Sequence, residues 1–203
     1  MKSDISVASL QRLPVYLNYL KTLDGGERYI SSGAIARALN MGEVLVRKDL
    51  AFTSAQGRTR VGYRLCELIR ALEEYLGCND KKNAVLIGAG GLGQALLSYG
   101  GFGNYGIELV AAYDNDPEKT GWKIEGKPVL CMEELLQGVT EYSVKLAIIC
   151  VPAVYAQGVA DLLVECGVKK ILNFAPALLS VPDGFIVRNI DVAANLAILA
   201  SMT

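Results

Sequence analysis

The chain has 203 residues, of which 52% are hydrophobic and 20% charged, so it can form one or two well-buried cores. No run of about 18 uncharged apolar residues occurs, and the opening MKSDISVASLQR lacks a secretory signal, which predicts a cytoplasmic protein without a membrane span. The five cysteines form no CxxC pair, which predicts reduced thiols and no metal site. The chain has no histidine, which excludes every mechanism that needs a Ser/His or Cys/His couple.

The charges are unevenly distributed along the chain. Residues 1–78 carry 11 Lys and Arg against 8 Asp and Glu, whereas residues 79–203 carry 9 against 13. Five cations and one anion fall between residues 46 and 64. Such a local cationic surface suits a polyanionic partner. A solvated face without a partner is the alternative.

The period of the apolar pattern changes near LGCNDKKNA. Apolar residues recur at helical spacing from 9 to 76, and short Val- and Ile-rich runs alternate with helix-like segments from 84 onward. Gly77 suits the end of a helix, and the polar NDKK after it offers no core position. We therefore expect a first domain over 1–79 and a second from residue 80.

The first domain carries a helix-turn-helix pattern. We expect a helix over about 9–23, bent or delayed by Pro14, and then a turn at 24–26. In YISSGAIARALNMGEVLVRKDLAFT, Ser32 can cap a short helix that carries Ile35, Ala36 and Leu39 on one face. Residues 40–42 form a tight turn, and a second helix runs from Glu43 to about Phe52.

The second of these helices has the features of a DNA-recognition helix. Val46 and Leu50 are four residues apart and face inward, which leaves Leu45, Arg47 and Lys48 outward. In a major groove these two cations can reach guanine edges or phosphates.

A wing follows the recognition helix. SAQGRTRVGY alternates small, basic and apolar residues between glycines, which predicts a β-ribbon that brings Arg58 and Arg60 to phosphates or the minor groove. CELIRALEEYLG predicts an amphipathic helix that packs in the core. The pattern favours a winged-helix DNA-binding domain, with double-stranded DNA as partner. The predicted DNA-contacting residues are Ser32, Leu45, Arg47, Lys48, Arg58 and Arg60.

The second domain opens with a glycine-rich loop. AVLIGAGGLGQAL places Gly88, Gly90 and Gly93 as G-x-G-x-x-G directly after a buried strand and at the start of a helix, a pattern typical of a dinucleotide pyrophosphate site. Ala89, Gly91 and Leu92 complete the predicted loop. The next strand, IELVAAYD, ends in Asp114, where a carboxylate accepts hydrogen bonds from the adenosine ribose. No arginine follows at once, which favours NAD(H) over NADP(H), although Lys119 is a nearby cation.

The remaining segments predict a doubly wound parallel sheet of Rossmann type. VKLAIICVP, KKILNFAP and GFIVRNI read as strands and AVYAQGVADLLVECG as a helix, which gives an α/β fold for this domain. Ligands lie beyond the carboxyl ends of such strands. We therefore expect Val151, Pro152, Asn173, Phe174 and Ala175 to border the nicotinamide.

Three functions are compatible with these elements. An NAD-dependent oxidoreductase with a helical accessory domain needs an acid or base beside the nicotinamide, but the chain has no histidine and no Tyr-x-x-x-Lys pair. A protein that binds CoA or another nucleotide is a second alternative, because glycine loops are only loosely specific. With a DNA-binding domain beside it, a dinucleotide that is not turned over is most useful as a signal, so we assign no catalytic residue.

The motifs together resemble the Rex family of bacterial redox-sensing transcriptional repressors. In family order they are RLPVYLNYLKTL, ISSGAIARAL, VRKDLAF, GRTRVGY, IGAGGLGQAL, AYDNDPEKTG, VPAVYAQ, ILNFAPALLSVP and RNIDVAANL. The resemblance implies a homodimer whose winged helices bind a palindromic operator and whose Rossmann domains, over 80–190, sense the NADH/NAD⁺ ratio. NADH binding would release the DNA.

The resemblance also assigns roles to single residues. Arg47 and Lys48 match the family's recognition helix, the glycine loop its nucleotide site and Asp114 its ribose carboxylate. Tyr99 and Asp191 match positions that report on the nicotinamide pocket, and residues 191–203 match a dimerisation helix exchanged between subunits.

The chain departs from the family pattern in several places. Asn18 stands where the family's signalling network commonly has an arginine in the first helix. Thr53 and Ser54 close the recognition helix where an aromatic residue and glycine are usual, and Arg60 stands where the wing usually has glycine. The sequence stops at Thr203, and the shorter exchanged helix would bury less apolar surface and weaken the dimer.

Overall fold

The computed structural model describes residues 5–23 and 28–202 and divides the chain into two compact units, Met1–Asp80 and Lys81–Thr203. The turn expected at 24–26 lies outside the described residues. In the part of the chain that is described, no helix has the length and apolar character needed to cross a membrane.

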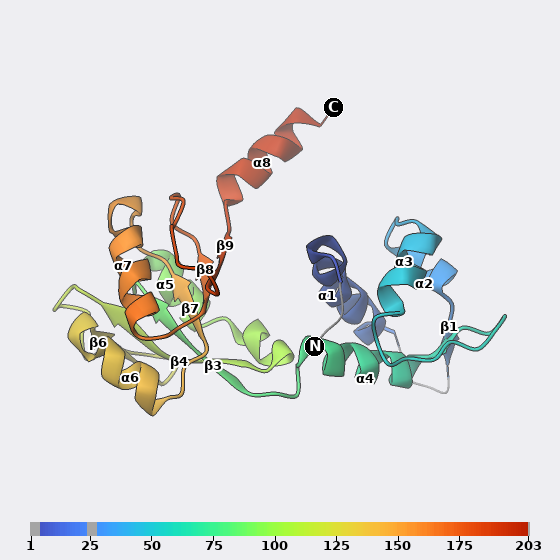
Figure 1. Cartoon of the computed structure of the whole chain (residues 1–203), viewed down its shortest axis with the longest axis horizontal. Coiled ribbons are helices and arrows are strands. Elements are labelled where there is room, and N and C mark those ends of the chain that lie inside the picture. Colours follow the sequence, from blue (N-terminus) through green and yellow to red (C-terminus); the bar gives the residue numbers. More distant parts are fainter. Residues whose placement is uncertain (1–4, 24–27, 203) are drawn as a thin grey trace. The chain divides into compact units, whose positions relative to one another are not determined.

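The described residues of the first unit form four helices and a small antiparallel sheet (Figure 1). Strands β1 and β2 pair with Tyr29 opposite Arg64. The core is lined by leucines of α1 and α4 together with Ile35, Val46 and Leu50, which are fully buried. The elements are α1 (Val7–Lys21), β1 (Tyr29–Ile30), α2 (Ser32–Ala38), α3 (Glu43–Leu50), β2 (Tyr63–Arg64) and α4 (Leu65–Leu76).

The helix boundaries correct three details of the prediction. Helix α1 begins at Val7, two residues early, because Ser6 caps it by accepting from the backbone N–H of Ser9, and Pro14 lies inside the helix instead of delaying it. Ser31, not Ser32, caps α2 through the N–H of Ala34. The sequence did not distinguish Ser31 from Ser32, because the two serines are adjacent and either hydroxyl can cap a helix. Ser6 has the same capping chemistry at the start of α1.

The recognition helix is also shorter than predicted. Helix α3 ends at Leu50, and the Thr53 hydroxyl donates to the Leu50 carbonyl at 2.7 Å and accepts from the N–H of Ala55 at 3.3 Å. Thr53 and Ser54 therefore belong to the turn after α3. Because threonine side chains compete for backbone groups, the helix stops where this local bonding begins.

The second unit contains a seven-stranded sheet in the order β5-β6-β4-β3-β7-β8-β9. All neighbouring pairs are parallel except β5 and β6. The strands are β3 (Lys82–Ile87), β4 (Ile107–Asp114), β5 (Lys123–Ile124), β6 (Lys127–Cys131), β7 (Leu146–Ile149), β8 (Lys170–Asn173) and β9 (Ile186–Asn189). Strand order reverses between β3 and β7, so the predicted Rossmann-type sheet is confirmed and its ligand crevice lies beside these two strands.

Helices cover both faces of this sheet. Val85 and Ile87 of β3 pack with α6 (Leu135–Glu141) and α7 (Ala153–Glu165). Ala84 and Leu86 point to the other face, against α5 (Gly91–Leu97) and the 3-10 helix η1 (Gly100–Tyr105). The sequence analysis missed β5, β6, α6 and both 3-10 helices, the second being η2 (Met132–Glu134).

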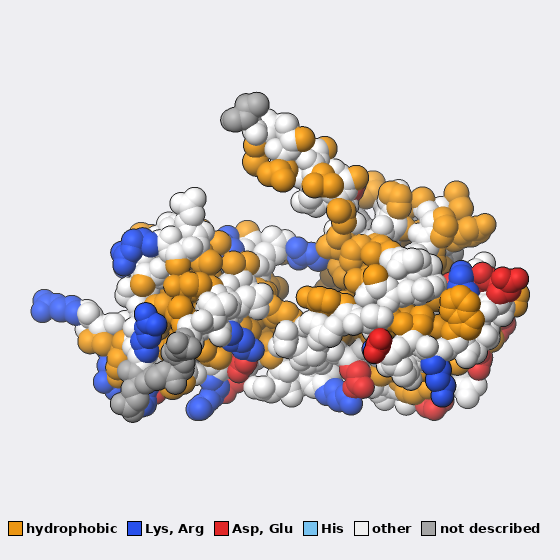
Figure 2. Space-filling model, turned by 180° about the vertical axis from the view of Figure 1, so that it is seen from behind, with side chains coloured by type: hydrophobic (Ala, Val, Ile, Leu, Met, Phe, Trp, Pro, Cys, Tyr) orange, Lys and Arg blue, Asp and Glu red, His pale blue; other side chains and the backbone are white. Residues whose placement is uncertain are grey.

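The final helix, α8 (Val192–Ser201), carries apolar side chains that the chain itself leaves exposed. Figure 2 shows these side chains along the helix. The exposed apolar residues are Val192, Leu196, Ile198 and Leu199.

Candidate functional site

The glycine loop lies where strand order reverses. Gly88 follows β3 with φ 100°, and its N–H donates to the Tyr113 carbonyl of β4 at 2.8 Å. A Cβ atom on Gly88 would stand 2.6 Å from the Cys150 carbonyl oxygen after β7. Glycine is therefore required both by the left-handed backbone and by the close approach of β7.

The other two glycines of the G-x-G-x-x-G motif, Gly90 and Gly93, serve different purposes. A Cβ on Gly93 would collide with the Gly88 carbonyl, so this glycine lets α5 pack against the loop. A Cβ on Gly90 would meet no atom within 4 Å. Since Gly90 also has an ordinary φ of −74° and no side chain caps α5, the fold alone does not explain glycine here. The open space beside Gly90 would admit a ligand phosphate close to the backbone.

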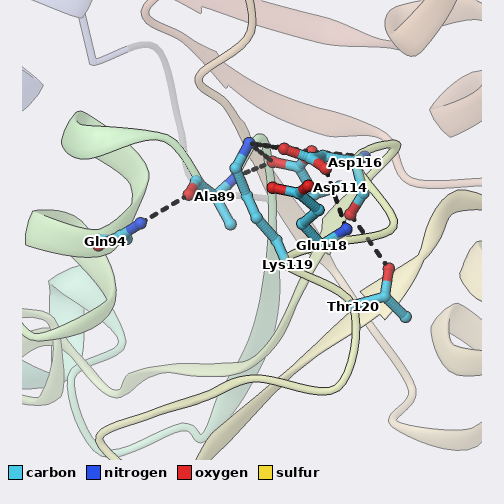
Figure 3. Close-up of polar contacts among 7 residues, drawn as sticks. All are labelled: Ala89, Gln94, Asp114, Asp116, Glu118, Lys119 and Thr120. Atoms are coloured by element: carbon cyan, nitrogen blue, oxygen red, sulfur yellow. Dashed lines mark hydrogen bonds and ion pairs between the residues drawn. The ribbon is translucent and has the colours of Figure 1, made fainter.

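Asp114 ends β4 and is tied to the glycine loop (Figure 3). One carboxylate oxygen accepts from the N–H of Ala89 at 2.7 Å and the other from the N–H of Asp116 at 2.9 Å. The Lys119 ammonium also contacts both oxygens, at 3.3 and 3.4 Å. Since a carboxylate has about four lone-pair positions, a ligand hydroxyl here would take the place of one of these long lysine contacts.

Lys119 bridges the two carboxylates at this end of the site (Figure 3). Its ammonium nitrogen lies 3.2 Å from an oxygen of Asp116 and 3.3 Å from one of Asp114. The hydrogen bond to Asp116 raises the pKa of Lys119, and the backbone N–H of Glu118, followed by Lys119, lowers the pKa of Asp116. Two carboxylates against one ammonium give the cluster a net negative charge, which disfavours a 2′-phosphate.

A cavity of about 630 Å³ connects the loop with Asp114. The predicted residues that line it are Gly88, Gly90, Asp114, Val151 and Pro152. The apolar part of the cavity is suited to a flat heterocycle. It is lined by residues that were not predicted from the sequence: Met132, Cys150, Tyr155, Val159 and Leu162. The helical spacing of 155, 159 and 162 was a usable signal for three of them. Burial raises the pKa of the Cys150 thiol to about 12, so this cysteine stays neutral.

The other predicted nucleotide-site residues do not line this cavity: Ala89, Gly91, Leu92, Gly93, Tyr99, Asn173, Phe174, Ala175 and Asp191. Asn173 is fully buried, and its side chain bonds to Ala175, Ala177 and Asn189, so it holds the turn after β8 together. Tyr99 is exposed and packs edge-to-face on Phe102 with ring centroids 5.3 Å apart. Phe174 and Ala175 share the turn of Asn173.

Asp191 is the N-cap of α8. Its carboxylate accepts from the N–H of Ala194 at 2.8 Å. The position that the family resemblance links to the nicotinamide therefore also sets the start of the apolar final helix.

In the first unit, α3 exposes the predicted side chains. Val46 and Leu50 are buried, and Leu45, Arg47 and Lys48 are exposed, as the helical spacing predicts. Asn18 is exposed on α1.

A buried ionic network that the sequence analysis did not predict holds α3 against α1. The Arg12 guanidinium donates to both oxygens of Asp49, at 2.6 and 2.8 Å, and the Tyr16 hydroxyl donates to the same carboxylate at 2.6 Å. Burial alone would raise the pKa of Asp49, but the bonds from Arg12 and Tyr16 outweigh it and lower this pKa. Burial followed by the bond to Asp49 raises the pKa of Tyr16 to about 12. The network fixes the helix that carries Arg47 and Lys48.

The wing is smaller than the predicted β-ribbon. It contains one isolated bridge between Arg58 and Gly62 before β2. The Arg58 guanidinium lies 5.5 Å from the centre of the Tyr29 ring, within cation–π range. Arg60 has φ 65°, a left-handed conformation that costs a residue other than glycine about 1 kcal/mol. The two arginines therefore sit on a tight turn instead of on paired strands.

Within residues 5–23 and 28–202, no three or more Cys, Asp and Glu side chains form a group that could hold a metal ion. None of the five cysteines, all of which are described, forms a disulfide.

Two family models match the chain. Residues 79–177 match a CoA binding domain, and residues 4–51 match the N-terminus of putative DNA-binding proteins. The DNA-binding model falls within the first unit, and the CoA-binding model begins two residues before the second unit.

The chain is similar over almost its whole length to curated redox-sensing transcriptional repressors Rex. The chain and the repressor of Carboxydothermus hydrogenoformans are 45% identical, in an alignment that covers 96% of this chain and 94% of the relative. The chain is 42% identical over 96% of its length to 93% of that of Desulforamulus reducens.

Solved structures agree with these similarities. One is the structure of RSP, a Rex-family repressor, in complex with β-NAD⁺ and operator DNA. It is 33% identical to this chain and has a TM-score of 0.92, and the match covers 98% of this chain and 92% of RSP. RSP in complex with β-NADH has a TM-score of 0.87, with 32% identity over 98% of this chain and 93% of its own. With identity above 30% over nearly all its length, the chain belongs to the Rex family of redox-sensing transcriptional repressors.

Proposed function

We propose that a homodimer of this chain represses transcription by binding operator DNA and releases the DNA when NADH binds. The observation that carries the proposal is the match to RSP, a protein of the same family that has been crystallised with β-NAD⁺ and operator DNA and with β-NADH. Because operator DNA lies in the bacterial cytoplasm, we infer that compartment.

The residues of the second unit fit a nicotinamide dinucleotide. Gly90 leaves room for a pyrophosphate beside the start of α5, and Asp114 lines the same cavity, where ribose hydroxyls would replace its long contacts with Lys119. When bound, the dinucleotide supplies a nicotinamide ring whose oxidised form carries one more positive charge than its reduced form. The relatives are named as repressors, so the ligand is sensed and not turned over.

Asp191 offers a path from this ligand to the dimer. Its carboxylate caps α8, and α8 exposes apolar side chains that a second copy can cover. Any ligand-dependent change at Asp191 alters the first turn of this helix. Tyr99, largely exposed and packed on Phe102, is assigned the same reporting role on the family resemblance alone.

In the first unit, α3 and the wing offer the DNA contacts. Arg47 and Lys48 present cations to a major groove, Arg58 and Arg60 lie on the wing, and Ser32 and Leu45 border them. Operator binding requires two recognition helices about 34 Å apart or a multiple of it, and the NADH-bound dimer loses this spacing.

Replacing Gly90 with alanine tests the nucleotide site. The folded protein has room for the methyl group, so the free energy of unfolding should not change. A ligand phosphate would lose at least one backbone hydrogen bond, worth about 1.5–3 kcal/mol, so NADH affinity should fall about tenfold or more. Titration calorimetry measures the affinity.

Gly103→Ala is the matched control, since a Cβ there also meets no atom within 4 Å. It should change neither stability nor NADH affinity. If Gly90→Ala binds NADH as tightly as the parent protein, the loop is not the phosphate site. Competition between NADH and CoA in the parent protein decides between the proposed ligand and the CoA alternative.

A further inference from the structure

The exposed face of α3 contains apolar side chains as well as cations. Val44 is 56% and Leu45 40% exposed. At 100° per residue, Val44 lies one turn before Lys48 at the centre of the face opposite Val46 and Leu50. The apolar pair therefore stands at the amino-terminal end of the helix, beside the two cations.

The acidic residue at the start of α3 is turned away from this face. The Glu43 carboxylate lies 3.5 Å from the Ser32 hydroxyl, and its oxygen would be 3.0 Å from a Cβ on Gly33. Because Glu43 is directed toward α2, it does not set a negative charge beside Val44 and Leu45. The negative charge of Glu43 lies beside Ser32 instead.

The side chains of α3 limit how it can read bases. All eight of its residues are described, and none is Asn or Gln, the side chains that recognise adenine by paired hydrogen bonds. Arg47 and Lys48 suit guanine. Val44 and Leu45 have no polar atom beyond the backbone, so the base group that complements them is the C5-methyl of thymine.

We infer that Val44 and Leu45 are specificity-determining residues that contact thymine methyl groups in each operator half-site. The inference rests on the proposed docking of α3 in the major groove, because helix-turn-helix proteins place the amino-terminal residues of this helix against base edges. The half-site should then combine thymines with guanines at successive positions.

Deoxyuridine substitution tests the inference without changing Watson–Crick pairing. The full-length protein first selects its tightest duplex from a random pool, and each half-site thymidine is then replaced singly by deoxyuridine. Loss of one buried methyl should weaken binding about fourfold. The variant Val44→Ala/Leu45→Ala should bind the thymidine and deoxyuridine duplexes equally well.

Val7→Ala is the matched control, because Val7 is also an exposed valine in the first turn of a helix. This variant should keep the discrimination. The inference is overturned if the selected half-site lacks thymine, if no deoxyuridine weakens binding, or if Val44→Ala/Leu45→Ala discriminates as the parent does, which would indicate a DNA-shape effect.

The same duplex separates this inference from the proposed function. If Arg47→Ala/Lys48→Ala leaves DNA affinity unchanged, α3 is not the recognition helix and both fail. If that variant binds weakly while deoxyuridine has no effect, only the thymine inference fails.

Discussion

Replacing Arg47 and Lys48 together with alanine should lower operator affinity by roughly 100-fold or more, because each base contact is worth about 1–3 kcal/mol and a dimer loses several. Both side chains are exposed on α3 and make no contact that the fold needs. NADH affinity and the unfolding temperature should not change. Fluorescence anisotropy with a labelled operator, repeated at several salt concentrations, measures the loss. The salt dependence should become shallower if phosphate contacts are lost as well.

A matched control removes the same two charges elsewhere. Lys123 and Lys145 are exposed lysines of the second unit, and Lys123→Ala/Lys145→Ala should retain most of the operator affinity. Equal losses for the two variants would mean that net charge, not α3, determines binding.

Replacing Asp49 with asparagine should lower the free energy of unfolding of the first unit by about 3 kcal/mol, because it leaves the Arg12 guanidinium without its charged partner. DNA affinity should fall too, since the network joins α3 to α1. Glu67, in an exposed ion pair with Arg64 at 3.5 Å, provides the control. Glu67→Gln should change stability by no more than about 0.5 kcal/mol. Equal stabilities for the two variants would contradict the role given to the network.

The same network predicts how stability depends on pH. The pKa of Asp49 is lower in the folded protein than the value of about 3.9 expected in the unfolded chain. Its contribution is therefore fully present above about pH 4 and is lost as the pH falls through the folded pKa. Urea unfolding between pH 7 and pH 3 should show a steeper loss for the parent than for Asp49→Asn. If the free energy of unfolding falls equally with pH in both proteins, the pKa of Asp49 does not differ between the folded and unfolded states.

Local patterns predicted most of the fold. The i, i+4 pair Val46 and Leu50 predicted the orientation of α3, and G-x-G-x-x-G after a buried strand predicted the loop between that strand and the next helix. These signals are contained in a few consecutive residues. The β5–β6 hairpin was missed because its strands are only two and five residues long and have no alternating apolar pattern. Helix α6, which follows this hairpin, was missed with it.

The rest depends on contacts between residues far apart in the sequence. Asp49 looks like an exposed charge of the recognition helix until Arg12, 37 residues away, is placed against it. Met132 follows β6 and reaches the cavity only because β6 pairs with β4. The turn role of Asn173 likewise depends on Asn189 in the neighbouring strand.

The most direct test is operator affinity of the full-length protein, titrated separately with NADH and with NAD⁺ at one fixed salt concentration. We expect NADH to weaken operator binding roughly 5–150-fold, the usual range of allosteric coupling, and NAD⁺ to weaken it far less. Equal operator affinity in the two titrations would contradict the conclusion that this chain senses the redox state of the coenzyme.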